Sequence, residues 1–361
     1  MLEDVAMIDD VQVVHYQHAD RERVFSFLRE AYPPADAARL LRHWDWKYET
    51  NPFNPDRKPY ILLLQKHQQL VGMYGRLFFP AIIDGTVQVV HHGCDLVVHP
   101  EYRGHGLSAL LRDRDLIESV IHFSWQNEAS YRVARRDGTA GVAYRALVRP
   151  LDVSAMLHQV VGDHWFSRAA SSLINRALQY MPPVRLHTAS SEVTVTRLSS
   201  FDDRFDRLWQ RCGGGYRAML VRDRRYLDWR FSQRPDAEYH IAAATRGSDL
   251  VGYMVTRCAD RNRGRWGYLV DFLVEERSAP VFAVLVAHAV DDLRRQGASL
   301  AICRIAVPPY GSMLYRQGFL PWPRARRGYL RVRMPAQNSP SVADAHEWFL
   351  TMGDGDLEMS F

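Results

Sequence analysis

The chain has 361 residues, of which 47% are hydrophobic and 24% are charged, and its formal net charge is +5. This length exceeds one typical domain, so we expect two domains with full hydrophobic cores. The composition excludes a disordered chain, and no apolar run is long enough to predict a membrane-spanning helix. The acidic start lacks the apolar stretch of a signal peptide, so we expect a cytoplasmic protein.

Cysteine and lysine usage narrows the classes of function. The cysteines lie far apart and form no Cys-x-x-Cys pair, so we expect neither a metal site nor a disulfide framework. Lysine stands only at Lys47, Lys58 and Lys66, and the other basic residues are arginine. Acidic residues are interspersed with the arginine runs, which favours a solvated surface over a nucleic-acid interface. The oligomeric state stays open.

The elements of the first half follow from hydrophobic periodicity and turn signals. Asp84-Gly85 is a hairpin signal between two strands. In chain order we expect a strand at 11–15, helices at 21–31 and 36–48, strands at 60–65, 71–80 and 87–98, a helix at 107–119, a strand at 120–125, a helix at 128–135 and a strand at 142–148.

The second half has a similar order of elements. Residues 154–180 read as a helix that connects the halves, and Pro182-Pro183 ends it. Beyond it we expect strands at 193–197, 240–244, 252–257, 268–274 and 300–305 and a helix at 281–296. The pattern predicts an α/β chain of the α+β kind, with a mixed, mostly antiparallel sheet flanked by helices in each half.

Three short stretches recur in the same order in the two halves, namely Asp45-Trp46-Lys47-Tyr48 as Asp228-Trp229-Arg230-Phe231, Leu70-Val71-Gly72 as Leu250-Val251-Gly252, and Asp95-Leu96-Val97-Val98 as Asp271-Phe272-Leu273-Val274. Ordered internal similarity indicates a duplicated unit. We therefore expect an N-terminal domain (1–153), a helical linker (154–190), a C-terminal domain (191–335) and a tail (336–361). The repeated aromatic residues are expected to pack the same joint in both domains.

The stretch that follows the strand at 87–98 is the most informative local pattern. A loop with Arg103, Gly104 and Gly106 leads into a helix that begins at Leu107. The N–H groups of a first helical turn have no partner inside the helix, and the helix dipole favours negative charge there. Glycine lets the backbone approach a phosphate closely. The stretch predicts a diphosphate-binding site, but it is neither the dinucleotide fingerprint nor a P-loop.

Arg103-Gly104-His105-Gly106-Leu107-Ser108 resembles the coenzyme A loop of the GNAT acyltransferase superfamily, R/Q-x-x-G-x-G/A, with Ser108 where the family usually has Gly or Ala. The resemblance implies two tandem GNAT-like domains and an acyl-CoA, most simply acetyl-CoA, as co-substrate. It implies that the diphosphate binds the N–H groups of His105 to Ser108 with help from Arg103. It also implies that the pantetheine amides pair with the backbone of Leu96, Val97 and Val98, and that Asn127 contacts the cofactor.

Acyl transfer to an amine needs proton transfers, because the amine must lose a proton and the leaving thiolate prefers to gain one. His91 and His92 lie on the preceding strand, and His92 falls near the place of the glutamate base that many family members carry. Neighbouring residues on a strand face opposite ways, so at most one of them faces the cleft. A water chain without a side-chain base stays possible. For the phenol that protonates the sulfur, the resemblance favours Tyr131, with Tyr144 second.

The second copy lacks the glycine loop, since Val274 is followed by Glu275-Glu276-Arg277-Ser278-Ala279-Pro280. Two acids and no glycine would repel a diphosphate, so we expect one cofactor site, in the first half. The predicted function is N-acyl transfer, most simply N-acetyl transfer, to an amine of a small molecule or sugar. Two alternatives remain: a Fem-like aminoacyl-tRNA-dependent transferase, although such enzymes usually lack this loop, and a non-catalytic coenzyme A-binding scaffold or sensor.

Overall fold

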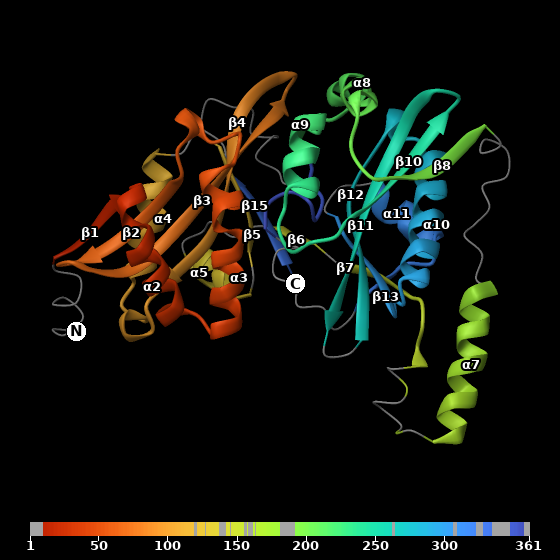
Figure 1. Ribbon diagram of the computed structural model, residues 1–361, viewed down its shortest axis with the longest axis horizontal. Helices are drawn as coiled ribbons and strands as arrows, with labels where there is room; N and C mark the ends of the chain where they lie inside the picture. Colours follow the sequence, from red (N-terminus) through yellow and green to blue (C-terminus); the bar gives the residue numbers. More distant parts are fainter. Residues whose placement is uncertain are drawn as a thin grey trace.

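The computed structural model describes residues 10–118, 121–126, 128–136, 142–144, 146–154, 157, 162, 164–180, 192–261, 264–305, 309–322, 328–333 and 347–356. The strands within these residues form two mixed sheets that lie side by side, each flanked by helices (Figure 1). The predicted fold class is thereby confirmed. Among the helices of the described residues, none is long and apolar enough to cross a bilayer.

The first sheet has the order β1-β2-β3-β4-β5-β15-β6, with β9 beside β3 and β16 beside β9. Its neighbours are antiparallel except for the pairs β4/β5 and β9/β16. The strands are β1 (Val11–His15), β2 (Tyr60–Lys66), β3 (Gln69–Ile83), β4 (Thr86–Val98), β5 (His122–Gln126), β6 (Val142–Tyr144), β9 (Ala218–Leu220), β15 (Gly328–Arg333) and β16 (Trp348–Phe349).

The second sheet has the order β14-β7-β13-β12-β11-β10-β8. Here β12 and β13 are the parallel pair, and the other neighbours are antiparallel. The strands are β7 (Ala146–Pro150), β8 (Val193–Leu198), β10 (His240–Arg246), β11 (Asp249–Arg261), β12 (Gly264–Val274), β13 (Leu300–Arg304) and β14 (Leu320–Pro321).

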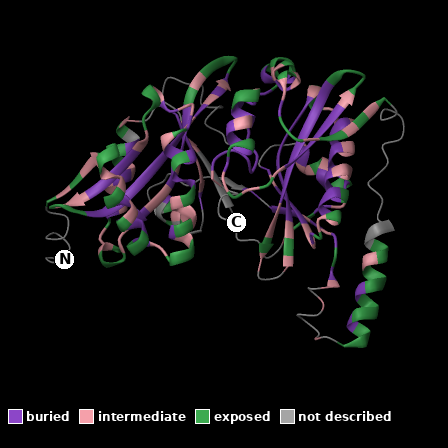
Figure 2. Cartoon of the chain, viewed as in Figure 1, coloured by how far each residue is buried: buried purple, intermediate pink, exposed green. Residues whose placement is uncertain are grey.

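Helices cover both faces of the first sheet. Because side chains alternate along a strand, Ile61 and Leu63 of β2 join the main core, whereas Leu62 and Leu64 pack with Leu107 of α4. The strand interiors are accordingly the most buried parts of the chain (Figure 2). The helices are α2 (Arg21–Ala31), α3 (Pro34–Trp44), α4 (Leu107–Glu118), α5 (Glu128–Arg136), α7 (Trp165–Tyr180), α8 (Asp203–Cys212), α9 (Arg224–Leu227), α10 (Ala279–Arg295) and α11 (Tyr310–Arg316).

The two sheets exchange strands. β7 follows β6 in the chain, yet it pairs with β13 in the second sheet. In return, β15 comes from the second half of the chain and lies between β5 and β6 in the first sheet. Each sheet is therefore completed by the other half of the sequence, and the sheets do not separate at residue 153. The division of the chain into domains at residues 153, 190 and 335 stays a prediction.

The repeated aromatic stretches meet each other. Both form a π-helical turn, over Asp45–Glu49 and over Asp228–Ser232. Trp46 and Trp229 stack with ring centroids 5.1 Å apart and an interplanar angle of 20°. Each indole N–H donates to the backbone carbonyl of the other residue, at 2.7 Å from Trp46 and 3.3 Å from Trp229. The two copies therefore form one shared joint between the sheets, with a reciprocal contact, rather than two separate joints.

A C-terminal strap, which we define as residues 347–356, passes between the two sheets (Figure 1). Its strand β16 pairs with β9 of the first sheet. Further along, the N–H of Gly353 donates to the carbonyl of Val270 in β12 at 2.8 Å. Trp348, Phe349, Leu350 and Met352 are all fully buried. The strap therefore forms part of the core that joins the two sheets.

Candidate active site

The glycine loop before α4 is open to solvent. Gly104 has a φ of 91° and Gly106 a φ of 77°, a backbone conformation that side chains other than glycine adopt only with strain. A Cβ atom built on either glycine has no atom within 4 Å. Both glycines are exposed, and α4 begins directly after them at Leu107. The loop and the first turn of α4 thus form a concave, accessible backbone surface that suits a diphosphate.

Arg103 braces this loop. Its Nε donates to the carbonyl of Val98 at 3.0 Å, and one terminal nitrogen donates to the carbonyl of Ala31 at 3.1 Å. The guanidinium therefore ties the loop to the end of β4 and to the end of α2. The sequence predicted that the positive charge of Arg103 helps to bind the diphosphate. The structure shows in addition that Arg103 holds the loop in place through two hydrogen bonds. Direct contact between Arg103 and a phosphate stays a prediction.

The parallel strands β4 and β5 pair over only two positions. His91 is opposite His122, and His92 is opposite Phe123. Beyond these positions β5 continues to pair with β15, while β4 continues without β5 to Val98. β4 also carries a bulge at Asp95, whose φ is 50°. The predicted pantetheine residues Leu96, Val97 and Val98 lie on this part of β4, directly before the glycine loop.

His92 lies where β4 and β5 part, and it is fully buried. Its Nδ1 lies 3.2 Å from the carbonyl oxygen of Phe123, and its Nε2 lies 2.7 Å from Oδ1 of Asp356. The Asp356 side chain is 28% exposed. Burial acts to raise the pKa of Asp356, but the nearby charges of His92 and Lys47 outweigh it and hold the pKa below its usual value.

A second ion pair lies beside the first. Nζ of the buried Lys47 is 2.7 Å from Oδ2 of Asp95, and the hydroxyl of Tyr48 donates to the same oxygen at 2.5 Å. Burial acts to lower the pKa of Lys47, but the charge of Asp95 outweighs it and raises the pKa. Burial raises the pKa of the Cys94 thiol as well. The site therefore holds a lysine cation and a neutral thiol, and Cys94 does not have the character of a thiolate nucleophile.

His91 belongs to a different cluster. Its Nε2 lies 3.1 Å from Oδ1 of Asp115 on α4, and Oδ2 of Asp115 lies 3.3 Å from Nδ1 of His122. Nε of Arg76 binds Asp115 at 2.8 Å. Burial lowers the pKa of His91. The cluster links α4 to β3, β4 and β5, so it holds the glycine-loop helix on the sheet. Of the two candidate bases, only His92 is hydrogen-bonded to the partly exposed carboxylate of Asp356.

The candidate acids occupy different environments. Tyr131 is half-buried on α5, the helix that follows β5. Tyr144 is buried at 6% exposure and packs edge-on against Trp125, with ring centroids 5.0 Å apart, and burial raises the pKa of its phenol. Asn127, the predicted cofactor contact, lies outside the described residues. The roles of these residues stay predictions.

The equivalent loop of the second half is closed by its own side chains. Glu275 pairs with Arg211 at 2.6 Å, and the guanidinium of Arg277 lies 4.5 Å from the ring centre of Tyr216 and donates to the carbonyl of Gly215. Glu276 has a φ of 48° and lies three residues before α10, just as Gly104 lies three residues before α4. The segment Glu275–Arg277 therefore offers a diphosphate no glycine of its own and adds acidic repulsion.

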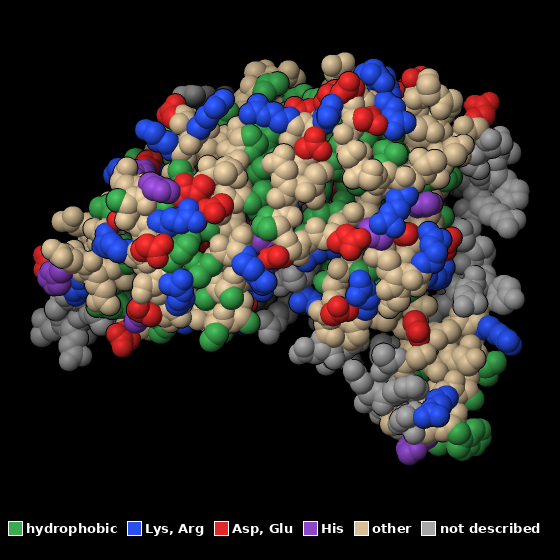
Figure 3. Space-filling view, viewed as in Figure 1, with side chains coloured by type: hydrophobic (Ala, Val, Ile, Leu, Met, Phe, Trp, Pro, Cys, Tyr) green, Lys and Arg blue, Asp and Glu red, His purple; other side chains and the backbone are tan. Residues whose placement is uncertain are grey.

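Sequence reasoning missed Asp356, which lies 264 residues from His92 in the chain and belongs to no motif. It also missed Lys47 and Tyr48 as neighbours of the site, although the repeated Asp-Trp-Lys-Tyr stretch had singled them out. On the face shown in Figure 3, basic and acidic side chains are interspersed.

Comparison with solved structures places this geometry in a known fold. A GCN5-related N-acetyltransferase from Anabaena variabilis aligns with a TM-score of 0.57 at 13% identity, over 89% of this chain and 72% of that one. A GCN5-related N-acetyltransferase from Kribbella flavida aligns with a TM-score of 0.56 at 17% identity, over 91% and 72%. Saccharomyces cerevisiae N-myristoyltransferase with bound myristoyl-CoA aligns with a TM-score of 0.56 at 12% identity, over 94% and 88%.

The sequence comparisons give no further assignment. No protein-family model matches the chain, and no curated protein sequence is significantly similar to it. At these identities the structural likeness concerns the fold. The chain therefore has the fold of the GNAT superfamily, as its Arg103–Ser108 loop had suggested.

Proposed function

We propose that this protein is an acyl-CoA-dependent N-acyltransferase with one donor site, in the first half of the chain. The observation that carries the proposal is the open glycine loop at the start of α4, placed directly after a strand that has parted from its parallel neighbour. The structural neighbours include acyltransferases, one of them with bound myristoyl-CoA, and this likeness supports the proposal.

The residues present fit coenzyme A. The exposed backbone at Gly104, Gly106 and the first turn of α4 would hold the diphosphate through N–H groups. The part of β4 that has left β5 would offer backbone groups to the pantetheine amides. The cofactor supplies the activated acyl group as a thioester, and the protein supplies its position and the proton transfers.

For the acceptor side we propose direct attack by an amine near the point where β4 and β5 part. We assign removal of the amine proton to His92 on β4 and protonation of the sulfur to Tyr131 on α5, because the loop resemblance singles out both residues. We further propose acetyl-CoA as the donor and a small-molecule or sugar amine as the acceptor. The second half then supports the site rather than binding a second cofactor.

A thiol-release assay tests this proposal. Purified protein is mixed with acetyl-CoA and longer acyl-CoAs, each against a panel of amines, and free thiol is followed over time. We expect amine-dependent thiol release together with a matching N-acyl product by mass spectrometry. Coenzyme A binding without transfer to any amine would instead favour a sensor or scaffold, and the absence of coenzyme A binding would reject the donor assignment.

A further inference from the structure

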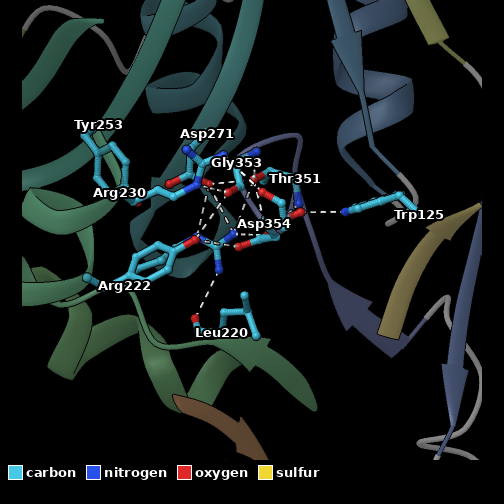
Figure 4. A network of polar contacts seen from close by, with 11 residues as sticks. Trp125, Leu220, Arg222, Arg230, Tyr253, Asp271, Thr351, Gly353 and Asp354 are labelled. Carbon is cyan, nitrogen blue, oxygen red and sulfur yellow. Dashed lines mark hydrogen bonds and ion pairs between the residues drawn. The ribbon is translucent and has the colours of Figure 1, made fainter. Parts of the chain in front are cut away.

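The C-terminal strap passes beside β12 of the second sheet on its way to the candidate active site, and a buried polar network holds its middle part (Figure 4). Asp354 of the strap accepts from Arg222 at 2.5 Å, and Arg222 also binds Asp271 at 3.1 Å, with all three side chains at most 1% exposed. Thr351 donates to Asp271 at 2.7 Å. These contacts fix the middle of the strap against β12.

Two further hydrogen bonds hold the end of the strap in place. Arg230 donates to the carbonyls of Gly353 and Gly355, at 2.7 Å and 3.2 Å. Gly355 has a φ of 84°, and a Cβ atom there would lie 3.0 Å from the His92 ring. The strap therefore passes directly over the imidazole, at a residue that has to be small, and delivers Asp356 to Nε2 of His92.

The partner at each ring nitrogen of His92 indicates whether that nitrogen donates or accepts a hydrogen bond. Nδ1 faces the carbonyl of Phe123, which can only accept, so Nδ1 carries a hydrogen. Nε2 faces the carboxylate of Asp356 at 2.7 Å, a partner that also accepts. With an accepting oxygen at each ring nitrogen, the pair is arranged to share one proton between Nε2 of His92 and the carboxylate of Asp356.

The surroundings of the pair are nearly charge-balanced. Lys47 and Asp95 form the adjacent ion pair, and the pair of His92 with Asp356 is likewise neutral as a whole. The other titratable groups that act on the pair or on its neighbours are Tyr32, His91, Cys94 and Tyr144. Since His92 is fully buried and Asp356 is 28% exposed, the carboxylate is the end of the pair that substrate can reach.

We propose that Asp356, delivered by the C-terminal strap, is part of the acyl-transfer site and forms with His92 the proton-transfer pair of the reaction. This inference rests on the proposed function. The acceptor nitrogen bonds to the acyl carbon and the carbon–sulfur bond breaks. The pair takes the proton that the nitrogen sheds, Tyr131 gives its phenol proton to the departing sulfur, and proton exchange with solvent then restores both groups.

The inference can be tested with Asp356→Asn, which keeps the shape of the side chain but removes the charge. We expect kcat to fall by about 10²-fold or more, while the coenzyme A dissociation constant stays within about twofold, because the change acts on the transition state alone. Asp356→Glu should restore part of kcat. Glu347→Gln, on an exposed carboxylate of the same strap, is the matched control and should leave kcat unchanged.

A readout without turnover separates the two proposals. Nitrogen-15 NMR of histidine-labelled full-length protein, with the His92 signals assigned by His92→Gln, should show a hydrogen bond at each ring nitrogen. Asp356→Asn should remove that signature. Wild-type protein with no acyl transfer to any amine would overturn the proposed function, whereas an active wild type with an equally active Asp356→Asn variant and an unchanged His92 spectrum would overturn this inference alone.

Discussion

Replacement of Arg222 by methionine should loosen the strap from within. Arg222 is fully buried between Asp271 and Asp354, so the substitution leaves two carboxylates without their shared cation. Removal of one partner of a buried ion pair costs about 3–5 kcal/mol. Asp271 keeps the Tyr253 hydroxyl at 2.7 Å, and Asp354 keeps the Thr351 N–H at 2.7 Å, so we expect the lower end of that range, about 3 kcal/mol.

The loss of folding stability in Arg222→Met should depend on pH in a defined direction. Burial and the charge of Asp271 raise the pKa of Asp354 above its usual value. An acid whose folded pKa is raised disfavours the folded state as pH rises through that pKa. Without Arg222 the pKa rises further, so the deficit should be full at pH 7.5 and shrink toward pH 5.5, by up to about 1.4 kcal/mol per pH unit.

Urea unfolding followed by tryptophan fluorescence measures this loss, with Arg246→Met as the matched control. Arg246 is exposed, and its Nε lies 4.0 Å from the Glu192 carboxylate, so the control should change stability by less than about 0.5 kcal/mol. An Arg222→Met deficit below about 1 kcal/mol at both pH values would refute the reasoning that this network holds the strap.

Three other predictions concern the loop, the phenol and the buried histidine cluster. Gly106→Ala should cost about 1 kcal/mol of stability and weaken coenzyme A binding at least about tenfold in calorimetry. Gly247→Ala is the control, because Gly247 is also exposed, with a φ of 60° and open space around it. This control should cost similar stability and leave coenzyme A binding unchanged. Tyr131→Phe should lower kcat with little change in coenzyme A affinity if Tyr131 is the acid, and equal turnover would reject that role in favour of the His92–Asp356 pair. Burial holds the folded pKa of His91 below its usual 6.5, so the neutral imidazole is favoured in the folded state. Stability should therefore fall as pH drops below 6.5, by at most about 1.4 kcal/mol per pH unit, and His91→Phe should flatten this slope of the urea midpoints.

Local patterns in the sequence predicted most of the elements around the site. The helix expected at 107–119 is α4 at Leu107–Glu118, and the strand expected at 87–98 is β4 at Thr86–Val98. Both are set by short-range signals, namely a hairpin turn, a glycine loop and an apolar stripe, which act over a few residues. The helix expected at 36–48 is α3 followed by a π-helical turn, a change of hydrogen-bond register that periodicity does not reveal.

Long-range pairings could not be predicted in the same way. The strand expected at 142–148 is two strands, β6 and β7, that belong to different sheets. Nothing in the local pattern of Ala146–Pro150 distinguishes a neighbour in the first sheet from one in the second, because both offer apolar strands of similar length. The repeat predicted that Trp46 and Trp229 are equivalent, but only the packing of the halves brings them into contact.

The glycine loop of the candidate site could be predicted from the sequence, but the contribution of the strap could not. Gly104 and Gly106 are recognisable because glycine is the residue that adopts a positive φ without strain. Asp356 is not, because the stretch Gly353-Asp354-Gly355-Asp356 resembles an ordinary solvated turn, and the position of Asp356 depends on Arg222 and Arg230 holding the strap. The pairing of His92 with Asp356 became visible only with the structure.

Calorimetric titration of the full-length protein with coenzyme A tests the central claim most directly. The account predicts one site per chain, lost or strongly weakened in Gly106→Ala and unchanged in Glu276→Gln of the closed second loop. Two equivalent sites, or binding that survives Gly106→Ala but fails in Glu276→Gln, would contradict the claim that the backbone before α4 alone holds the donor.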